Sequence, residues 1–228
     1  MPKYYPMMAD LTGKRCLVVG GGRVAERKVA LLLDCGAAVE VVSPATTPKL
    51  AVLASTGAIR LATRAVRSDD LPGAFVVFAA TDDPEVNRAV AAEAREAGGL
   101  VNVVDAPEAC SFLVPSVIRR GDLTIAISTA GGSPALAKRL RQRLEATVGP
   151  EYEAFLAALR ELRAQARRVI GDPAERQTIY RQALDSDLFD HAARGDREAV
   201  KACIADLLRR AVRTAGGTKA GRLGAHDR

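Results

Sequence analysis

A run of glycines between a short apolar segment and an amphipathic one constrains the fold of this chain more than any other feature. Residues 14–20, centred on Cys-Leu-Val-Val, are typical of a buried strand, and residues 24–35 have the apolar spacing of a helix. Across this junction the segment from Gly20 to Ala25 fits the pattern G-x-G-x-x-G/A. The order strand, glycine turn, helix is the context in which this pattern carries structural meaning.

Each fixed position of the pattern has a physical role. Gly20 permits a tight turn, Gly22 lets the backbone approach a pyrophosphate, and Ala25 keeps the helix close to the sheet. The helix N-terminus supplies unpaired N–H groups and the positive end of the helix dipole for the two phosphates. The segment therefore predicts a dinucleotide-binding turn, and the alternative is a glycine-rich turn that binds no ligand.

The residue that usually separates NAD from NADP is missing from its expected place. An acidic residue at the end of the second strand commonly binds the ribose 2′-hydroxyl. Here that strand, residues 39–43, ends in Ser43 and Pro44, and Glu40 lies too early in it. No arginine stands there to bind a 2′-phosphate. We expect Ser43 to make the ribose contact, and the residues alone leave NAD and NADP open.

The first 105 residues alternate between strand-like and helix-like segments, which predicts an α/β fold. The expected architecture is an open, parallel Rossmann-type sheet with helices on both faces. The predicted strands are residues 14–20, 39–43, 59–62, 75–80 and 100–104, and the predicted helices are residues 24–35 and 85–97.

The pattern changes after residue 105. Residues 112–118 and 123–128 predict two strands joined by a turn of hairpin length, and Pro134 begins a predicted helix that runs to about Thr147. These elements form a small α+β region. Residues 152–211 then predict a helical C-terminal domain.

Two further features of the C-terminal part follow from its glycines and prolines. Breaks between helices are expected near residues 171–173 and near Gly195. Residues 214–228 are Gly-rich and polar, which is typical of a disordered tail.

Composition and charge exclude several classes of protein. The longest apolar runs, such as residues 75–80, are far shorter than the roughly 20 residues of a membrane span. The N-terminus lacks the apolar run of a signal peptide, so a cytoplasmic location and no membrane contact are expected. The formal net charge of +6 is shared equally between residues 1–150 and 151–228, and tryptophan is absent. A nucleic-acid partner is therefore not expected.

The cysteines and histidines do not predict a metal site. Cys16, Cys35, Cys110 and Cys203 are widely spaced and form no Cys-x-x-Cys pair, and the chain has only 2 histidines. We interpret the cysteines as buried or incidental thiols in a reducing compartment.

Three stretches in order resemble the precorrin-2 dehydrogenase and sirohydrochlorin ferrochelatase family, which also occurs as the N-terminal part of siroheme synthase. They are residues 18–28 (Val-Val-Gly-Gly-Gly-Arg-Val-Ala-Glu-Arg-Lys), residues 101–112 (Val-Asn-Val-Val-Asp-Ala-Pro-Glu-Ala-Cys-Ser-Phe) and residues 127–137 (Ile-Ser-Thr-Ala-Gly-Gly-Ser-Pro-Ala-Leu-Ala). The first stretch alone is a weak signal, whereas the three together are specific.

The resemblance implies both an architecture and an activity. It implies a Rossmann domain over residues 1–113, a dimerisation region over 114–149 and a helical domain over 150–213, in a homodimer. The implied reaction is the NAD-dependent oxidation of precorrin-2, a small tetrapyrrole, to sirohydrochlorin on the route to siroheme. Siroheme synthases add a methyltransferase module, and because this chain ends soon after Arg213, uroporphyrinogen methylation is not expected.

The resemblance also implies site residues. The family's key carboxylate falls on Asp105, at the end of a predicted strand, where we expect a general base. The alternative is that Asp105 only forms an Asx turn before Pro107. The expected cofactor contacts are Gly20, Gly21, Gly22, Arg23, Val24, Ala25, Ser43, Pro44, Thr81, Asp82, Asn102 and Val103.

The substrate carries many carboxylates, so its site should present cations. The expected substrate contacts are Ser111, Arg119, Arg120 and Lys138, with Arg139 and Arg141 as further cationic candidates. Ordinary solvated side chains on a helix face explain these cations equally well.

Two functional alternatives stay open. Some members of the family also insert Fe²⁺ into sirohydrochlorin, and Asp105 would then take protons from the pyrrole nitrogens. A second possibility is a Rossmann module that senses NAD without catalysis. Turnover of NAD with precorrin-2 separates the enzyme from the sensor.

Overall fold

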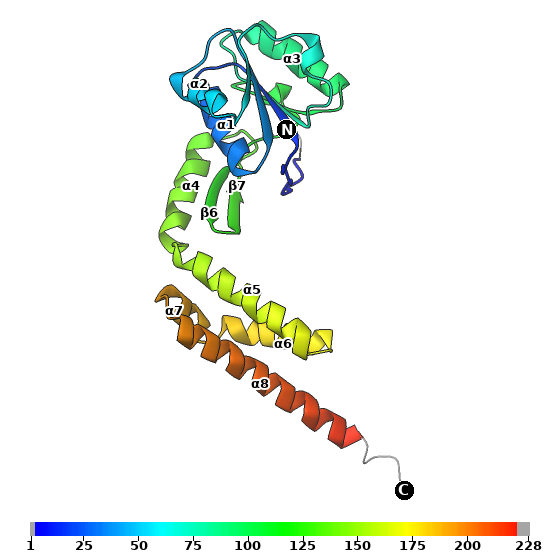
Figure 1. The fold of residues 1–228 in the computed structure, drawn as a ribbon, viewed down its shortest axis with the longest axis vertical. Coiled ribbons are helices and arrows are strands. Elements are labelled where there is room, and N and C mark those ends of the chain that lie inside the picture. Colours follow the sequence, from blue (N-terminus) through cyan, green and yellow to red (C-terminus); the bar gives the residue numbers. More distant parts are fainter. Residues whose placement is uncertain (1–2, 223–228) are drawn as a thin grey trace. The chain divides into compact units, whose positions relative to one another are not determined.

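The computed structural model describes residues 3–222 of the chain, with side chains described for residues 3–213. It divides into two compact units (Figure 1). The first consists of the chain up to Pro115 together with Ser128–Pro134, and the second consists of Ser116–Ile127 together with the chain from Ala135 onward. The predicted boundary near residue 149 is not one of these divisions and stays a prediction.

The first unit is built on a parallel sheet of five strands, as the alternating pattern predicts. The strand order is β3-β2-β1-β4-β5, and every neighbouring pair is parallel. The strands are β1 (Arg15–Val19), β2 (Ala38–Val42), β3 (Arg60–Ala62), β4 (Val76–Ala79) and β5 (Leu100–Val103).

Helices cover both faces of this sheet. They are α1 (Arg23–Asp34), α2 (Pro48–Ser55) and α3 (Pro84–Glu96), with short 3₁₀ turns at Ser68–Asp70 and Pro107–Ala109. Figure 1 shows α1 and α2 on one side of the strands and α3 on the other. Because successive strand residues point to opposite faces, Val18 packs in the core under α1 whereas Leu17 packs in the core under α3.

Helix α2 was not predicted from the sequence, although its start carries the usual signals. The Thr47 side chain accepts a hydrogen bond from the backbone N–H of Leu50, and Pro48 occupies the first helical position. Asp83 and Pro84 begin α3 in the same way, and the helix predicted over residues 85–97 is confirmed.

The second unit begins with a hairpin of β6 (Ser116–Arg120) and β7 (Leu123–Ile127), paired antiparallel with Arg120 opposite Leu123. Gly121 lies first in the two-residue turn with a φ of +56°, a backbone conformation that favours glycine. The prediction that the first strand begins at Phe112 is wrong. Residues 110–112 instead hydrogen-bond to β5 of the first unit, and Pro115 has no N–H to donate to a ladder.

Five helices complete the second unit. They are α4 (Pro134–Thr147), α5 (Glu151–Val169), α6 (Pro173–Leu184), α7 (Leu188–Ala193) and α8 (Arg197–Arg222). The predicted breaks near residues 171–173 and 195 are confirmed, and a further break separates α6 from α7. Leu162, Ile179, Leu188 and Ile204 pack together in the core of α5 to α8.

The end of the chain departs from the expected tail over part of its length. Helix α8 extends to Arg222, beyond the predicted start of the tail at residue 214. The rest of the predicted tail, residues 223–228, lies outside the described residues. Within residues 3–222 we find no helix of the length and apolarity that crossing a membrane requires.

Candidate functional site

The loops that carry the predicted cofactor residues all lie at one edge of the sheet. Gly20 follows β1, Ser43 follows β2, Thr81 follows β4 and Asp105 follows β5. Because these strands are parallel, their carboxyl ends share an edge. Strand β1 lies between β2 and β4, which is the point where the strand order reverses. Open α/β sheets bind their ligands in the crevice at such a point.

The glycine turn packs against the loop that follows β4 and the loop that follows β2. Gly20 has a φ of +115°, and a Cβ atom there would lie 2.3 Å from the Ala80 carbonyl oxygen. A Cβ atom on Gly21 would lie 2.1 Å from the Ala45 carbonyl oxygen. Both positions therefore require glycine for packing, and Gly20 also requires it for its backbone conformation.

Gly22 is different because a Cβ atom there would have no neighbour within 4 Å. It occupies the N-cap position of α1, where it has no side chain to cap the helix, so the N–H groups of the first turn stay available to a ligand. Arg23 is exposed and Val24 half-buried at this end of α1, and Ala25 is fully buried against the sheet. This open space at a bare helix N-terminus fits a diphosphate.

The loop after β2 is held by its own hydrogen bonds. Ser43 is buried, and its hydroxyl donates to the Ala45 carbonyl oxygen at 2.7 Å. Pro44 is exposed. The Thr47 hydroxyl donates to Glu26 on α1 at 2.9 Å, and the Thr47 N–H donates to the Gly21 carbonyl oxygen at 3.0 Å. The loop thus supports the glycine turn, and the predicted ribose contact of Ser43 stays a prediction.

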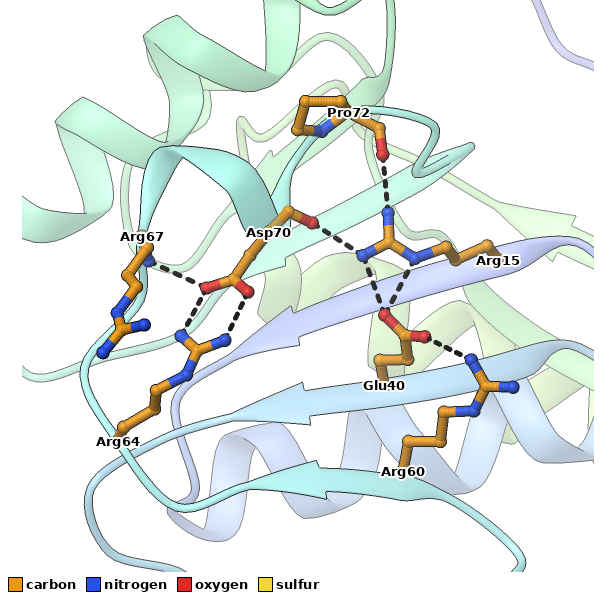
Figure 2. Close-up of polar contacts among 7 residues, drawn as sticks. All are labelled: Arg15, Glu40, Arg60, Arg64, Arg67, Asp70 and Pro72. Carbon is orange, nitrogen blue, oxygen red and sulfur yellow. Dashed lines mark hydrogen bonds and ion pairs between the residues drawn. The ribbon is translucent and has the colours of Figure 1, made fainter.

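Glu40 has other partners than a ribose (Figure 2). Its carboxylate accepts hydrogen bonds from Arg15 at 2.8 Å and from Arg60 at 3.1 Å. Burial raises the pKa of Glu40, but the hydrogen bonds and charges of the two arginines outweigh burial and hold this pKa below its ordinary value. Glu40 is therefore a structural residue of the sheet, in line with its place early in β2.

The loop after β4 is fixed by a residue that the sequence reasoning missed. Asn87 on α3 is buried, and its amide nitrogen donates to the Thr81 carbonyl oxygen at 2.9 Å. The Thr81 hydroxyl donates back to the Asn87 amide oxygen at 2.8 Å. Asp82 is exposed beside them. A buried Asn on the sheet-facing side of a helix is the signal that would have revealed this clamp.

After β5 the chain turns and runs back along the strand. The Ser111 N–H donates to the Val101 carbonyl oxygen at 2.8 Å, and the Ser111 hydroxyl accepts from the Val101 N–H at 2.7 Å. The buried Asn102 amide donates to the Phe112 carbonyl oxygen at 3.1 Å. The Val103 side chain is in the core. Asn102 and Ser111 thus hold the loop between them in place.

Asp105 lies at the tip of this loop in an unusual backbone conformation. Its φ is +58°, which costs about 1–2 kcal/mol in a residue with a Cβ atom, although aspartate tolerates it better than most. The side chain is exposed. Among the described residues its carboxylate has no hydrogen-bond partner, so the Asx turn that was the alternative to a general base does not form. Asp105 contributes to the turn through its backbone alone.

A second loop of the first unit lies near Pro107, two residues after Asp105. Ala130 has a φ of +52°, and the Thr129 hydroxyl accepts from the Ser133 N–H at 3.0 Å. A Cβ atom on Gly131 would lie 3.7 Å from the Pro107 side chain. The structure thus brings residues 101–112 and 128–133 together in the first unit.

Lys28 is a further cation of the first unit that the sequence reasoning left unassigned. Its ammonium group lies 5.0 Å from the centre of the Phe78 ring. Phe78 in turn makes an edge-on contact with Phe112. Burial, together with repulsion from Arg27, lowers the pKa of Lys28. Lys28 is therefore a half-buried cation beside the segment that returns along β5.

The predicted substrate cations lie in the second unit. Arg119 and Arg120 are in β6, and the Arg120 guanidinium donates to the Val148 carbonyl oxygen at 3.1 Å. Lys138 and Arg139 are exposed on α4, and Arg141 pairs with Glu145 one turn along the same helix. Their predicted substrate contacts stay predictions.

Three family models match consecutive parts of the chain. They are described as putative NAD(P)-binding over residues 7–116, sirohaem biosynthesis protein central over residues 120–147, and sirohaem synthase dimerisation region over residues 151–208.

Known relatives agree with these matches. The chain is 39% identical over 220 residues to a siroheme synthase of Methylococcus capsulatus, covering 95% of this chain and 46% of that protein. It is 42% identical over 206 residues to siroheme synthase 1 of Aeromonas salmonicida, covering 90% of this chain and 44% of that protein. The chain thus spans somewhat less than half the length of these relatives.

A solved structure covers nearly the whole fold. It is SirC, a precorrin-2 dehydrogenase, which is 28% identical in sequence with a TM-score of 0.74, over 87% of this chain and 99% of that one. Its likeness extends to the parallel sheet and to the helical part of the chain. On these matches, the chain belongs to the precorrin-2 dehydrogenase and siroheme synthase family.

Proposed function

We propose that this chain binds NAD at the turn Gly20–Ala25 and uses it to oxidise precorrin-2 to sirohydrochlorin. The observation that carries the proposal is the shared edge of the sheet, where the open space at Gly22 and the exposed carboxylate of Asp105 follow strands of one parallel sheet. The names of the family models and of SirC support the same cofactor and substrate.

In the proposed site the chain holds the cofactor through its backbone. The N–H groups at the start of α1 bind the diphosphate, and the absence of a side chain on Gly22 lets it approach. NAD supplies the acceptor for the hydride that the macrocycle loses. Thr81, bonded to Asn87, and Asn102, bonded to Phe112, fix the segments that follow β4 and β5 at the same edge of the sheet.

The oxidation also releases a proton, and Asp105 is the group that we assign to it. Its exposed carboxylate has no partner among the described residues and so is available to accept a proton from a carbon of the macrocycle. The cations Arg119, Arg120 and Lys138, with Ser111, bind substrate carboxylates in the proposal.

We propose a homodimer as the working form. Residues 151–208 match a dimerisation region of siroheme synthase, and α4 leaves Leu136, Leu140 and Leu144 between 37% and 48% exposed. These leucines recur every four residues, so they form one apolar stripe along the helix. A second copy of the chain would cover such a stripe.

A cytoplasmic location forms part of the proposal. The Cys110 thiol makes hydrogen bonds as a thiol, and Cys16 is fully buried in the sheet core. Free thiols at these positions fit the reduced state that the cytoplasm maintains. Fractionation of the source cells would test this location.

The proposed reaction is tested by anaerobic incubation of the protein with precorrin-2 and NAD. We expect sirohydrochlorin and NADH to form in equal amounts, measured by absorbance of the macrocycle and fluorescence of NADH. A parallel incubation with NADP measures the preference between the two cofactors. Binding of NAD without any turnover would identify a sensing module and refute the enzyme. Addition of Fe²⁺ after the first reaction reports any chelatase activity by the appearance of siroheme.

A further inference from the structure

One thiol lies inside the loop that carries Asp105. The Cys110 sulfur accepts a hydrogen bond from the Val103 N–H at 3.2 Å, and it lies 3.4 Å from the Ala106 carbonyl oxygen, to which its S–H can donate. A second carbonyl oxygen, that of Val103, lies at 3.4 Å. A single side chain thus contacts the backbone on both sides of Asp105.

Other hydrogen bonds join the two ends of the same loop. Ser111 is bonded to Val101 in both directions, and Asn102 is bonded to Phe112. These bonds fix where the loop begins and ends. Residues 104–106 have contacts of their own: the Val104 N–H donates to the Ala79 carbonyl oxygen at 3.0 Å, and the Ala109 N–H donates to the Ala106 carbonyl oxygen at 3.0 Å. The Cys110 sulfur adds a side-chain contact to the Ala106 carbonyl oxygen.

Asp105 needs such support because of its backbone. Its positive φ of +58° is a conformation that a residue with a side chain retains only when its surroundings hold it there. Its carboxylate has no partner of its own among the described residues. The direction of the carboxylate is therefore set by the backbone, and Cys110 holds that backbone from inside the loop together with the backbone hydrogen bonds of Val104 and Ala106.

We infer that Cys110 is a positioning residue for the dehydrogenase reaction: its thiol holds the loop so that the Asp105 carboxylate keeps the orientation that proton removal requires. This inference rests on the proposed function. Cys110 does not touch the reacting atoms in this role. It acts only through Asp105, which makes a clear prediction for combined substitutions.

The test compares Cys110→Ala, which removes the three contacts of the sulfur, with Cys110→Ser, whose hydroxyl can donate and accept in the same place. Cys203→Ala, a cysteine of the helical part, is the matched control. We expect Cys110→Ala to lower kcat about 10-fold to 100-fold, the usual result of a misplaced catalytic group, with NAD affinity unchanged. Cys110→Ser should recover most of the rate, and Cys203→Ala should retain it.

The double variant separates positioning from general support of the fold. Once Asp105→Asn has removed the base, the further change Cys110→Ala should lower kcat by less than about 2-fold, because the orientation it controls no longer matters. Fully multiplicative losses would overturn the inference. So would a Cys110→Ala protein that melts earlier but keeps its kcat.

A measurement without substrate distinguishes failure of this inference from failure of the proposed function. Amide hydrogen exchange at Val103 should rise at least about 10-fold in Cys110→Ala and return toward the original rate in Cys110→Ser. Unchanged exchange would show that the thiol does not hold the loop, whatever the activity. A wild-type chain that does not oxidise precorrin-2, with exchange as expected, would instead refute the proposed reaction and with it the catalytic role of Cys110.

Discussion

Arg64 and Asp70 form a two-pronged ion pair, in which Nη1 donates to Oδ2 at 2.7 Å and Nη2 donates to Oδ1 at 2.6 Å (Figure 2). The Asp70 backbone carbonyl in turn accepts from Arg15 at 2.7 Å. Asp70 therefore ties the segment between β3 and β4 to the first strand of the sheet.

This pair predicts a loss of stability in acid. The hydrogen bond from Arg64 lowers the pKa of Asp70 despite its partial burial, and Arg15 and Arg60 lower that of Glu40. A carboxyl whose pKa is lower in the folded chain stabilises the fold above its ordinary pKa, and this contribution is lost as the pH falls through the folded value. We expect the unfolding free energy to fall below about pH 4.

Urea titrations between pH 3 and pH 7 would measure this effect. Asp70→Asn and Glu40→Gln should be less stable than the wild type at pH 7. Their unfolding free energies should also fall less than that of the wild type between pH 7 and pH 3. Asp69→Asn, next to the pair and exposed, is the control and should follow the wild-type curve. If the unfolding free energies of all these variants depend on pH as that of the wild type does, the ion pairs do not cause the loss of stability in acid.

Two glycine substitutions should fail in different ways. Gly22→Asp adds a side chain where no atom lies within 4 Å, so we expect a folded protein that no longer binds NAD, because the carboxylate would occupy the diphosphate site. Gly21→Ala would instead collide with the Ala45 carbonyl and should cost roughly 2 kcal/mol or more of stability. Calorimetric NAD titration and thermal unfolding measure the two effects. Wild-type NAD affinity in Gly22→Asp would exclude this turn as the cofactor site.

Asp105→Asn is a sharper probe of the proposed base than Asp105→Ala. Asparagine tolerates a positive φ, so the loop should keep its shape while the carboxylate is lost. We expect turnover of precorrin-2 to fall by roughly 10² to 10⁴ with NAD affinity nearly unchanged. Asp105→Gly, which adopts a positive φ without strain, should be equally inactive. Either variant retaining most of the wild-type rate would return Asp105 to a turn-forming role.

Lys28 should be replaceable without loss of stability. Lys28→Met keeps the packing against Phe78 and removes an ammonium group that burial and Arg27 disfavour, so we expect the unfolding free energy to stay within about 1 kcal/mol of the wild type or to rise. Any gain should shrink as the pH rises toward the lysine pKa, because the wild-type side chain then loses its charge. Chemical denaturation at neutral and alkaline pH measures the unfolding free energy of both proteins. If the contact between the ammonium group and the Phe78 ring dominates, Lys28→Met will instead be less stable than the wild type at neutral pH.

The proposed dimer should depend on the leucine stripe of α4. Leu140→Glu places a charge at the middle of the stripe, and we expect it to raise the dimer dissociation constant at least about 10-fold. Light scattering across micromolar concentrations gives the mass of each form. Gln142→Glu, on the same helix and exposed, provides the matched control. A wild-type chain that is monomeric throughout this range would contradict the proposal.

The sequence predicted the sheet and its glycine turn because their determinants are local. Apolar runs such as residues 75–80, and a Gly at a positive φ, leave a mark within a few residues. The contacts of Cys110 leave no such mark, since their partners are backbone groups whose position depends on the folded loop. The same reason explains the wrong start of the first hairpin strand. Phe112 has strand-like neighbours, yet its carbonyl accepts a hydrogen bond from Asn102, so Phe112 belongs to the first unit and not to the hairpin.

The path of the chain between the two units has a consequence for any attempt to separate them. The backbone leaves the first unit after Pro115, returns to it at Ser128 and leaves again after Pro134. A truncation at Pro115 would therefore discard residues 128–134, including Gly131, whose backbone packs against Pro107 beside Asp105. The hairpin is thus an insertion within the Rossmann unit, and that unit cannot be excised, exchanged or inherited whole by a single cut in the gene.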